Sequence, residues 1–169
     1  MFRKYGWVIA VFIVAMFAWG AFSAEQASGA DANEYVGDNE KKCGMCHKEQ
    51  VAAWKKWPMA KTWDTLQASK DKKDSCIPCH VTGFGKPGGF VSIEKTPKLV
   101  NVQCEACHGP AKDHLAAPLN DVEKKRNTMT KPTEANCKTC HNKDSPHYKE
   151  FKYADAVKAL ADHKPKPKK

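Results

Sequence analysis

All eight cysteines of this 169-residue chain occur in one pattern, Cys-x-x-Cys-His, which is repeated four times. The four copies are Cys43, Cys46 and His47; Cys76, Cys79 and His80; Cys104, Cys107 and His108; and Cys137, Cys140 and His141. Because positions i, i+3 and i+4 share one face of a helical turn, each copy presents two thiols and an imidazole together. No cysteine lies outside this pattern, and each pair of thiols is directly followed by a histidine.

Disulfide pairing and zinc or iron–sulfur binding both use paired cysteines, but neither requires a histidine directly after the second cysteine. Histidine makes up only 7 of the 169 residues, so chance would place one after all four pairs at odds of roughly three in a million. Covalent c-type haem requires this arrangement, because the two thiols bond the porphyrin vinyl groups and the adjacent imidazole binds the iron. The sequence therefore predicts four covalently attached haem c groups.

The N-terminal residues have the pattern of an export sequence. Positive charge in MFRK precedes an uncharged apolar run, and small polar residues follow it. The run also approaches the length of a membrane span, so residues 1–24 are either a cleaved signal or a retained inner-membrane anchor. Both alternatives place the rest of the chain outside the cytoplasm, in the periplasm.

The formal net charge of +9 would by itself suggest nucleic acid or an anionic membrane surface as a partner. Removal of Arg3 and Lys4 with the N-terminal segment leaves +7. The propionates of four haems would then supply about eight negative charges and bring the loaded protein close to neutral. Together with export, this argues against nucleic acid as a partner.

The elements expected between the motifs are helices and long loops. Residues 39–57, 60–70 and 153–163 have helical patterns, Thr133 is a candidate helix cap, and residues 81–99 form a loop with at most a short hairpin. Apolar residues are too thinly spread to form a large core without the haems. We therefore expect a mainly α fold with little or no sheet, organised around four packed haems over residues 33–164, and a disordered basic tail at 165–169.

Several motifs resemble the tetrahaem cytochrome c-554 family over about residues 35–164. They are HVTGFG and GGF, then VQCEACHGPAKDH, then CKTCHN, and finally a histidine after an amphipathic helix. The resemblance implies a mostly helical periplasmic electron carrier with closely packed haem pairs. It also implies that His114 is the distal ligand of the first haem and His163 that of the fourth.

The remaining ligands stay open. The family usually has a histidine where this chain has Met59, so Met59 is either the thioether ligand of a haem, the third by resemblance, or an ordinary core methionine. His147 is either a ligand or an exposed loop residue, and Met129 is a weaker candidate. In one branch of the family the second haem is five-coordinate, and His147 or Met129 could fill that place here.

The favoured function is periplasmic electron transfer between respiratory redox partners, such as quinol-oxidising systems, terminal reductases or other cytochromes. No set of residues for nucleophilic or acid–base catalysis is evident, so the catalytic residues are expected to be none. Two alternatives remain: an enzyme acting on a small nitrogen or oxygen species at an open haem, and a subunit of a conducting haem filament.

Overall fold

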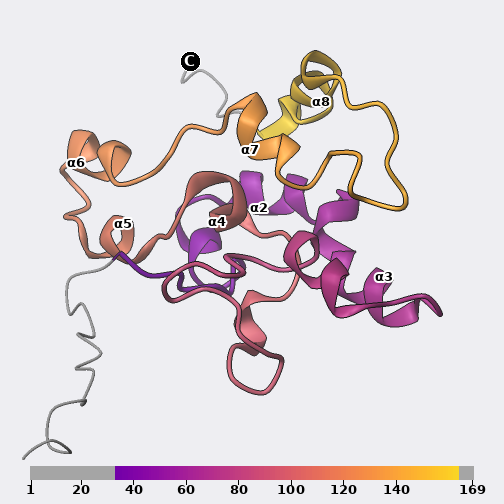
Figure 1. The fold of residues 1–169 in the computed structure, drawn as a ribbon. Helices are drawn as coiled ribbons and strands as arrows, with labels where there is room; N and C mark the ends of the chain where they lie inside the picture. Colours follow the sequence, from indigo (N-terminus) through magenta and orange to yellow (C-terminus); the bar gives the residue numbers. More distant parts are fainter. Residues whose placement is uncertain (1–32, 164–169) are drawn as a thin grey trace, which may run out of the picture. The chain divides into compact units, whose positions relative to one another are not determined.

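The computed structural model describes residues 33–163 (Figure 1). The expected signal or anchor at residues 1–24 and the expected tail at 165–169 lie outside these described residues. No helix within residues 33–163 is long and apolar enough to cross a membrane.

Short helices joined by long connections make up the described chain, as the sequence predicted. The α-helices are α2 (Lys48–Trp54), α3 (Thr62–Ala68), α4 (Cys104–His108), α5 (Lys112–Ala116), α6 (Val122–Asn127), α7 (Glu134–Lys138) and α8 (Tyr153–Ala159). The 3₁₀ helices are η1 (Cys43–Met45), η2 (Pro58–Lys61), η3 (Asp74–Cys79), η4 (Pro97–Leu99) and η5 (Ala161–His163). Within residues 33–163 the only β pairing is an isolated bridge between Val81 and Val100, which confirms a mainly α fold without a sheet.

The helix expected over residues 39–57 is shorter than its pattern suggested. The chain forms η1, breaks at His47, and is α-helical only over Lys48–Trp54. Trp57 is extended, with φ −84° and ψ 148°, because a residue that precedes proline is disfavoured in the helical region. The helix expected over 153–163 is likewise divided into α8 and η5.

The apolar core of the described chain is small. Val81, Phe90 and Leu99 form one buried cluster, against which Tyr35, Trp63, Ile77 and Val100 pack. Most of this cluster comes from the loop over residues 81–99, which folds back on itself where Thr82 N–H donates to the carbonyl of Leu99 at 2.8 Å. The loop therefore packs as a unit directly after the second cysteine–histidine motif.

The connections bring distant segments together. α2 contacts η5, which lies more than a hundred residues further along the chain, and α5 contacts α6 (Figure 1). Thr133 is the N-cap of α7, as predicted, and its N–H donates to Oδ1 of Asn136 at 2.9 Å. These contacts place histidines from separate segments against the four motifs.

Candidate haem centres

Each cysteine–histidine motif lies on a tight helical turn. The first uses η1, the second η3, the third α4, and the fourth starts in α7. His47 N–H donates to the carbonyl of Cys43 at 2.8 Å, and His141 N–H donates to that of Cys137 at 3.0 Å. In the first and fourth motifs these hydrogen bonds close one helical turn between the first cysteine and the histidine, the local geometry that the spacing predicts.

The thiols of the motifs meet in pairs. A hydrogen bond from Cys104 is the main cause that lowers the pKa of Cys43, and the same contact, together with burial, raises the pKa of Cys104. Burial and a contact with Cys140 raise the pKa of Cys79 to about 12. The first motif therefore lies beside the third, and the second lies beside the fourth. The charges of Cys137 and Cys140 also act on Cys107, so the third motif adjoins the fourth as well.

Two pairs of imidazoles face each other at a distance that fits one iron. The ring centroids of His47 and His114 are 6.2 Å apart, with 31° between the ring planes. Those of His108 and His163 are 6.1 Å apart, with 34° between the planes. Two nitrogens at about 2 Å on opposite sides of a metal ion place the centroids of their rings roughly 6 Å apart. The residues present therefore fit a six-coordinate iron at both places.

Main-chain carbonyls hold Nδ1 of four histidines. Nδ1 of His80 contacts the carbonyl of Thr62 at 2.5 Å, and Nδ1 of His108 contacts that of Thr130 at 3.1 Å. Nδ1 of His114 contacts the carbonyl of Lys125 at 3.0 Å, and Nδ1 of His163 that of Gln50 at 3.3 Å. A proton on Nδ1 leaves Nε2 with a free lone pair, and such hydrogen bonds are typical of metal-binding histidines.

The surroundings of these imidazoles favour their neutral form. Burial, followed by the neighbouring charges of His114, His163, His108 and Lys125, lowers the pKa of His47. Burial is also the main cause that lowers the pKa of His163. A neutral imidazole is the form that binds a metal, so these shifts are compatible with ligation.

The partner of His163 differs from the one that the family resemblance implied. His163 was expected at the fourth haem, whereas the structure places its ring opposite His108 of the third motif. The reason is that η5 packs on α2, which directs His163 toward α4. Met59 was expected at the third haem, whose motif histidine faces His163 in the structure.

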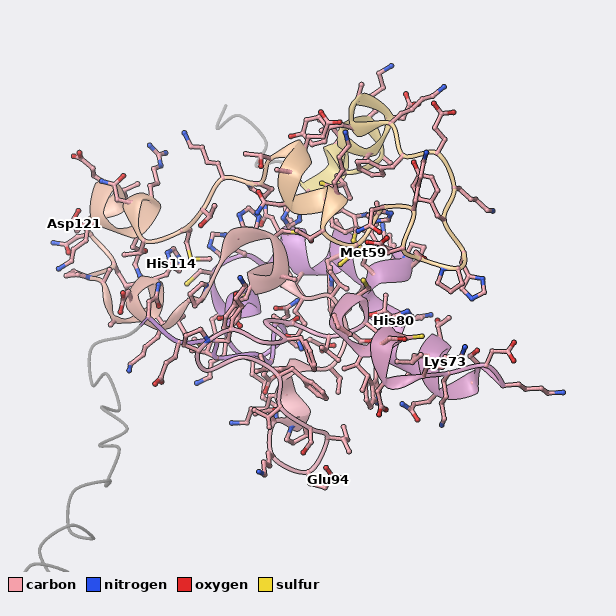
Figure 2. The ribbon with its side chains drawn as sticks, viewed as in Figure 1. Met59, Lys73, His80, Glu94, His114 and Asp121 are labelled. Atoms are coloured by element: carbon pink, nitrogen blue, oxygen red, sulfur yellow. The ribbon has the colours of Figure 1, made fainter. Side chains whose placement is uncertain are left out.

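Met59 lies beside the second motif (Figure 2). The hydroxyl of Thr62 donates to the carbonyl of Met59 at 3.3 Å and to that of His80 at 3.1 Å. The Met59 side chain is half-buried. Its segment therefore adjoins the second motif, whose Cys79 contacts Cys140 of the fourth motif.

The two spare candidates have different surroundings. His147 is exposed on a turn, where its main-chain N–H lies 3.4 Å from Oγ of Ser145. Met129 is half-buried at the end of the segment that carries α6. His141 stacks on Phe151, with ring centroids 4.8 Å apart and 22° between the planes. Phe151 thus covers one face of the fourth imidazole, a contact that the sequence did not suggest.

A buried polar junction joins the first motif to the third. Oδ1 of Asn39 accepts from the Cys104 N–H at 3.3 Å and from the Cys43 thiol at 3.7 Å. Nδ2 of Asn39 is buried and has no hydrogen-bond partner. Since a buried amide N–H without a partner is costly, this orphan donor beside two motif cysteines fits a site built around a further polar group, such as a haem substituent.

The features above are those of a multihaem c-type cytochrome, and the comparisons with known proteins agree. Residues 42–109 match the family described as cytochrome c554 and c-prime. Cytochrome c-554 of Nitrosomonas europaea is 32% identical over 135 residues, which cover 62% of this chain and 57% of that protein. The multiheme cytochrome MtrA of Shewanella baltica is 28% identical over 109 residues, which cover 53% of this chain and 32% of that protein.

A solved structure has the same fold. The reduced state of cytochrome c554 from Nitrosomonas europaea aligns with a TM-score of 0.52 and 26% identity, over 80% of both chains. The matched regions span less than two thirds of the length of the two curated relatives. The matched family model, the sequence similarity and the shared fold make this chain similar to the cytochrome c-554 proteins, and the likeness supports a multihaem c-type cytochrome whose cofactor is covalent haem c.

Proposed function

We propose that this chain is an exported electron carrier with four covalent haems c, which passes single electrons between other redox proteins. The observation that carries the proposal is the presence of two pairs of facing imidazoles, whose ring centroids are 6.2 and 6.1 Å apart. Each pair consists of one motif histidine and one histidine from a distant segment. Each haem supplies one iron that accepts and returns one electron. The chain supplies the attachment, the ligands and the spacing.

The same geometry supports a set of ligands. His47 and His114 would hold the first iron, and His108 and His163 would hold the third. His80 would supply one ligand to the second iron, and His141 would supply one to the fourth. Met59 is the sixth ligand of one of these two, and its position beside Thr62 and His80 supports this assignment. His147 lies on a turn beside Ser145, where no second imidazole is found opposite its ring among the described residues, so it is left out of this ligand set.

The paired thiols support electron flow within the molecule. Cys43 lies against Cys104 and Cys79 against Cys140, so haems attached to these cysteines would be held close to one another, first with third and second with fourth. Electrons then pass between neighbouring haems without leaving the protein. The partners are other periplasmic redox proteins, such as quinol-oxidising systems, terminal reductases or other cytochromes, and the N-terminal segment directs export or attaches the chain to the inner membrane.

Intact-mass spectrometry tests the cofactor content directly. The purified protein is expected to carry four covalent additions of about 616 Da each. Serine replacement of both cysteines in one motif should remove one addition and leave the other three. A mass that equals the bare chain, or fewer than four additions in the unaltered protein, would contradict the proposal.

A further inference from the structure

Glu105 is a fully buried carboxylate inside the third motif, between Cys104 and Cys107. Its side chain is 1% exposed. One oxygen accepts from the Val36 N–H at 2.9 Å and the Ala111 N–H at 2.8 Å. The other accepts from the Gly37 N–H at 2.7 Å and the Val36 N–H at 3.2 Å. Because both oxygens only accept, the pattern is that of an ionised carboxylate.

No cation balances this charge among the described residues. The ion pairs found within residues 33–163 all join exposed or half-exposed side chains, and none includes Glu105. The four N–H contacts come from neutral main-chain groups, which stabilise the carboxylate without cancelling its charge. The field of Glu105 therefore extends into its surroundings, where a low dielectric constant makes it strong.

The field of Glu105 reaches both motifs of one pair. Glu105 directly follows Cys104, and its charge is one of the causes that act on the Cys43 thiol, where it opposes the lowering of the pKa. Burial and then the same charge raise the pKa of the Tyr35 hydroxyl. Cys43 and Cys104 contact each other, so one carboxylate acts on the first and third attachment sites together.

We propose that Glu105 is a fixed negative charge that lowers the midpoint potentials of the first and third haems relative to the second and fourth. A ferric iron carries one more positive charge than a ferrous iron, so a nearby anion stabilises the oxidised state. Each iron gains one electron from a redox partner and passes it on. The carboxylate exchanges neither an electron nor a proton.

The inference rests on the proposed function and gives it a direction. With the first pair held at lower potential, electrons that enter there move downhill to the second pair, which holds His80 and His141. Glu105 would also have a purely structural role, because its contacts tie residues 36–37 to α4. The two roles differ in their effect on potential, so the test must measure potentials as well as stability.

Glu105→Gln tests the charge with little change of shape, because the amide retains one accepting oxygen. Midpoint potentials are measured by a redox titration followed by low-temperature paramagnetic resonance, in which the two bis-imidazole irons give low-spin ferric signals. The expected result is an upward shift of these two midpoints and a smaller shift, or none, in the other two. Four unchanged midpoints, or an equal shift in all four, would overturn the proposal.

Two variants separate charge from packing. Glu105→Asp keeps the charge and disturbs the contacts, so the low potentials should survive in it even where stability falls. Glu134→Gln removes an exposed carboxylate that pairs with Lys138 near the fourth motif, and it should leave the first pair unchanged. A rise of the first-pair midpoints in Glu105→Asp as large as that in Glu105→Gln would also count against the charge.

If the Glu105→Gln protein does not take up haem, the Asn39→Asp variant tests whether a negative charge at this place lowers the two midpoint potentials. The new carboxylate keeps the acceptor for the Cys104 N–H and adds a charge beside the Cys43 sulfur. At pH 8 it should lower the same two midpoints, and a rise or no change would contradict the proposal. Absence of two bis-imidazole signals in the unaltered protein would instead refute the ligand assignment under the proposed function.

Discussion

Four histidine rings in this chain are oriented by main-chain carbonyls, those of Thr62, Thr130, Lys125 and Gln50. The histidines themselves are visible in the sequence, and their motif spacing or their place in the family pattern singles them out. The carbonyls are not visible, because every residue carries one and only the fold decides which one meets a ring. The candidate histidines could therefore be named from the sequence, whereas the orientation of their rings could not.

A substitution at Met59 provides the first prediction for a single residue. Replacement by histidine should lower one of the four midpoint potentials, because a thioether favours ferrous iron more than an imidazole does. The shift should be on the order of 100 mV and should be confined to one iron. Potentiometric titration of the visible haem bands measures it.

Met45 provides the matched control for that variant. It lies between the two cysteines of the first motif and its side chain is 63% exposed, so Met45→His should leave all four midpoints in place. If Met59→His also leaves them all in place, Met59 is a core residue and not a ligand.

At the scale of elements, α5 and α6 form a clasp around His114, the proposed distal ligand of the first iron. Nδ1 of His114 contacts the carbonyl of Lys125, and Nζ of Lys125 donates to the carbonyl of His114 at 2.7 Å. α6 is itself capped by Asp121, whose carboxylate accepts from the Lys124 N–H at 2.9 Å. Figure 2 shows His114 on a different part of the chain from Met59 and His80, so the clasp is separate from the second motif.

Lys125→Met should weaken this clasp without removing the ligand. A lost hydrogen bond of about 1 kcal/mol reduces the hold on His114, so protons displace it from iron more easily. The pH at which a high-spin signal appears during acid titration should rise by up to about one unit. Lys124→Met, a neighbouring exposed change on α6, should leave that pH unaltered; a rise of the same size there would point to a general loss of charge.

The elements were predictable to different degrees. The helices near residues 48–54, 62–68 and 153–159 followed from apolar spacing, and Thr133 was recognisable as a cap. Their ends were less predictable, because Pro58 fixed Trp57 as extended and the turn of the first motif separated η1 from α2. The pairing of η5 with α2 is a tertiary contact, and no local pattern indicated that His163 would face His108 rather than the fourth motif.

At the scale of the whole molecule, the polypeptide has too little buried apolar surface to explain its fold. The buried apolar side chains of the described part are Val51, Ala53, Leu66, Val81, Phe90, Leu99, Ala111 and Ala117, and three of these are alanine. Small domains with so limited a core usually depend on disulfides or metals. Covalent haem, which is large and apolar on both faces, fills this role here.

The chain without haem should therefore lack stable structure. Protein produced in cells unable to attach haem, and kept reduced, is expected to show little helical circular dichroism and fast amide hydrogen exchange at all sites. The haem-loaded protein serves as the control and should be protected around α2 and α4. A colourless chain with a compact, protected fold would contradict this expectation.

Low-temperature paramagnetic resonance of the oxidised protein tests the paired-imidazole arrangement most directly. The unaltered protein should show low-spin ferric signals from two bis-imidazole irons, and His114→Ala and His163→Ala should each convert a different one of them to high spin. His147→Ala should change neither signal. If either of the first two variants leaves both signals intact, or if His147→Ala removes one, the ligand arrangement derived from the fold is wrong.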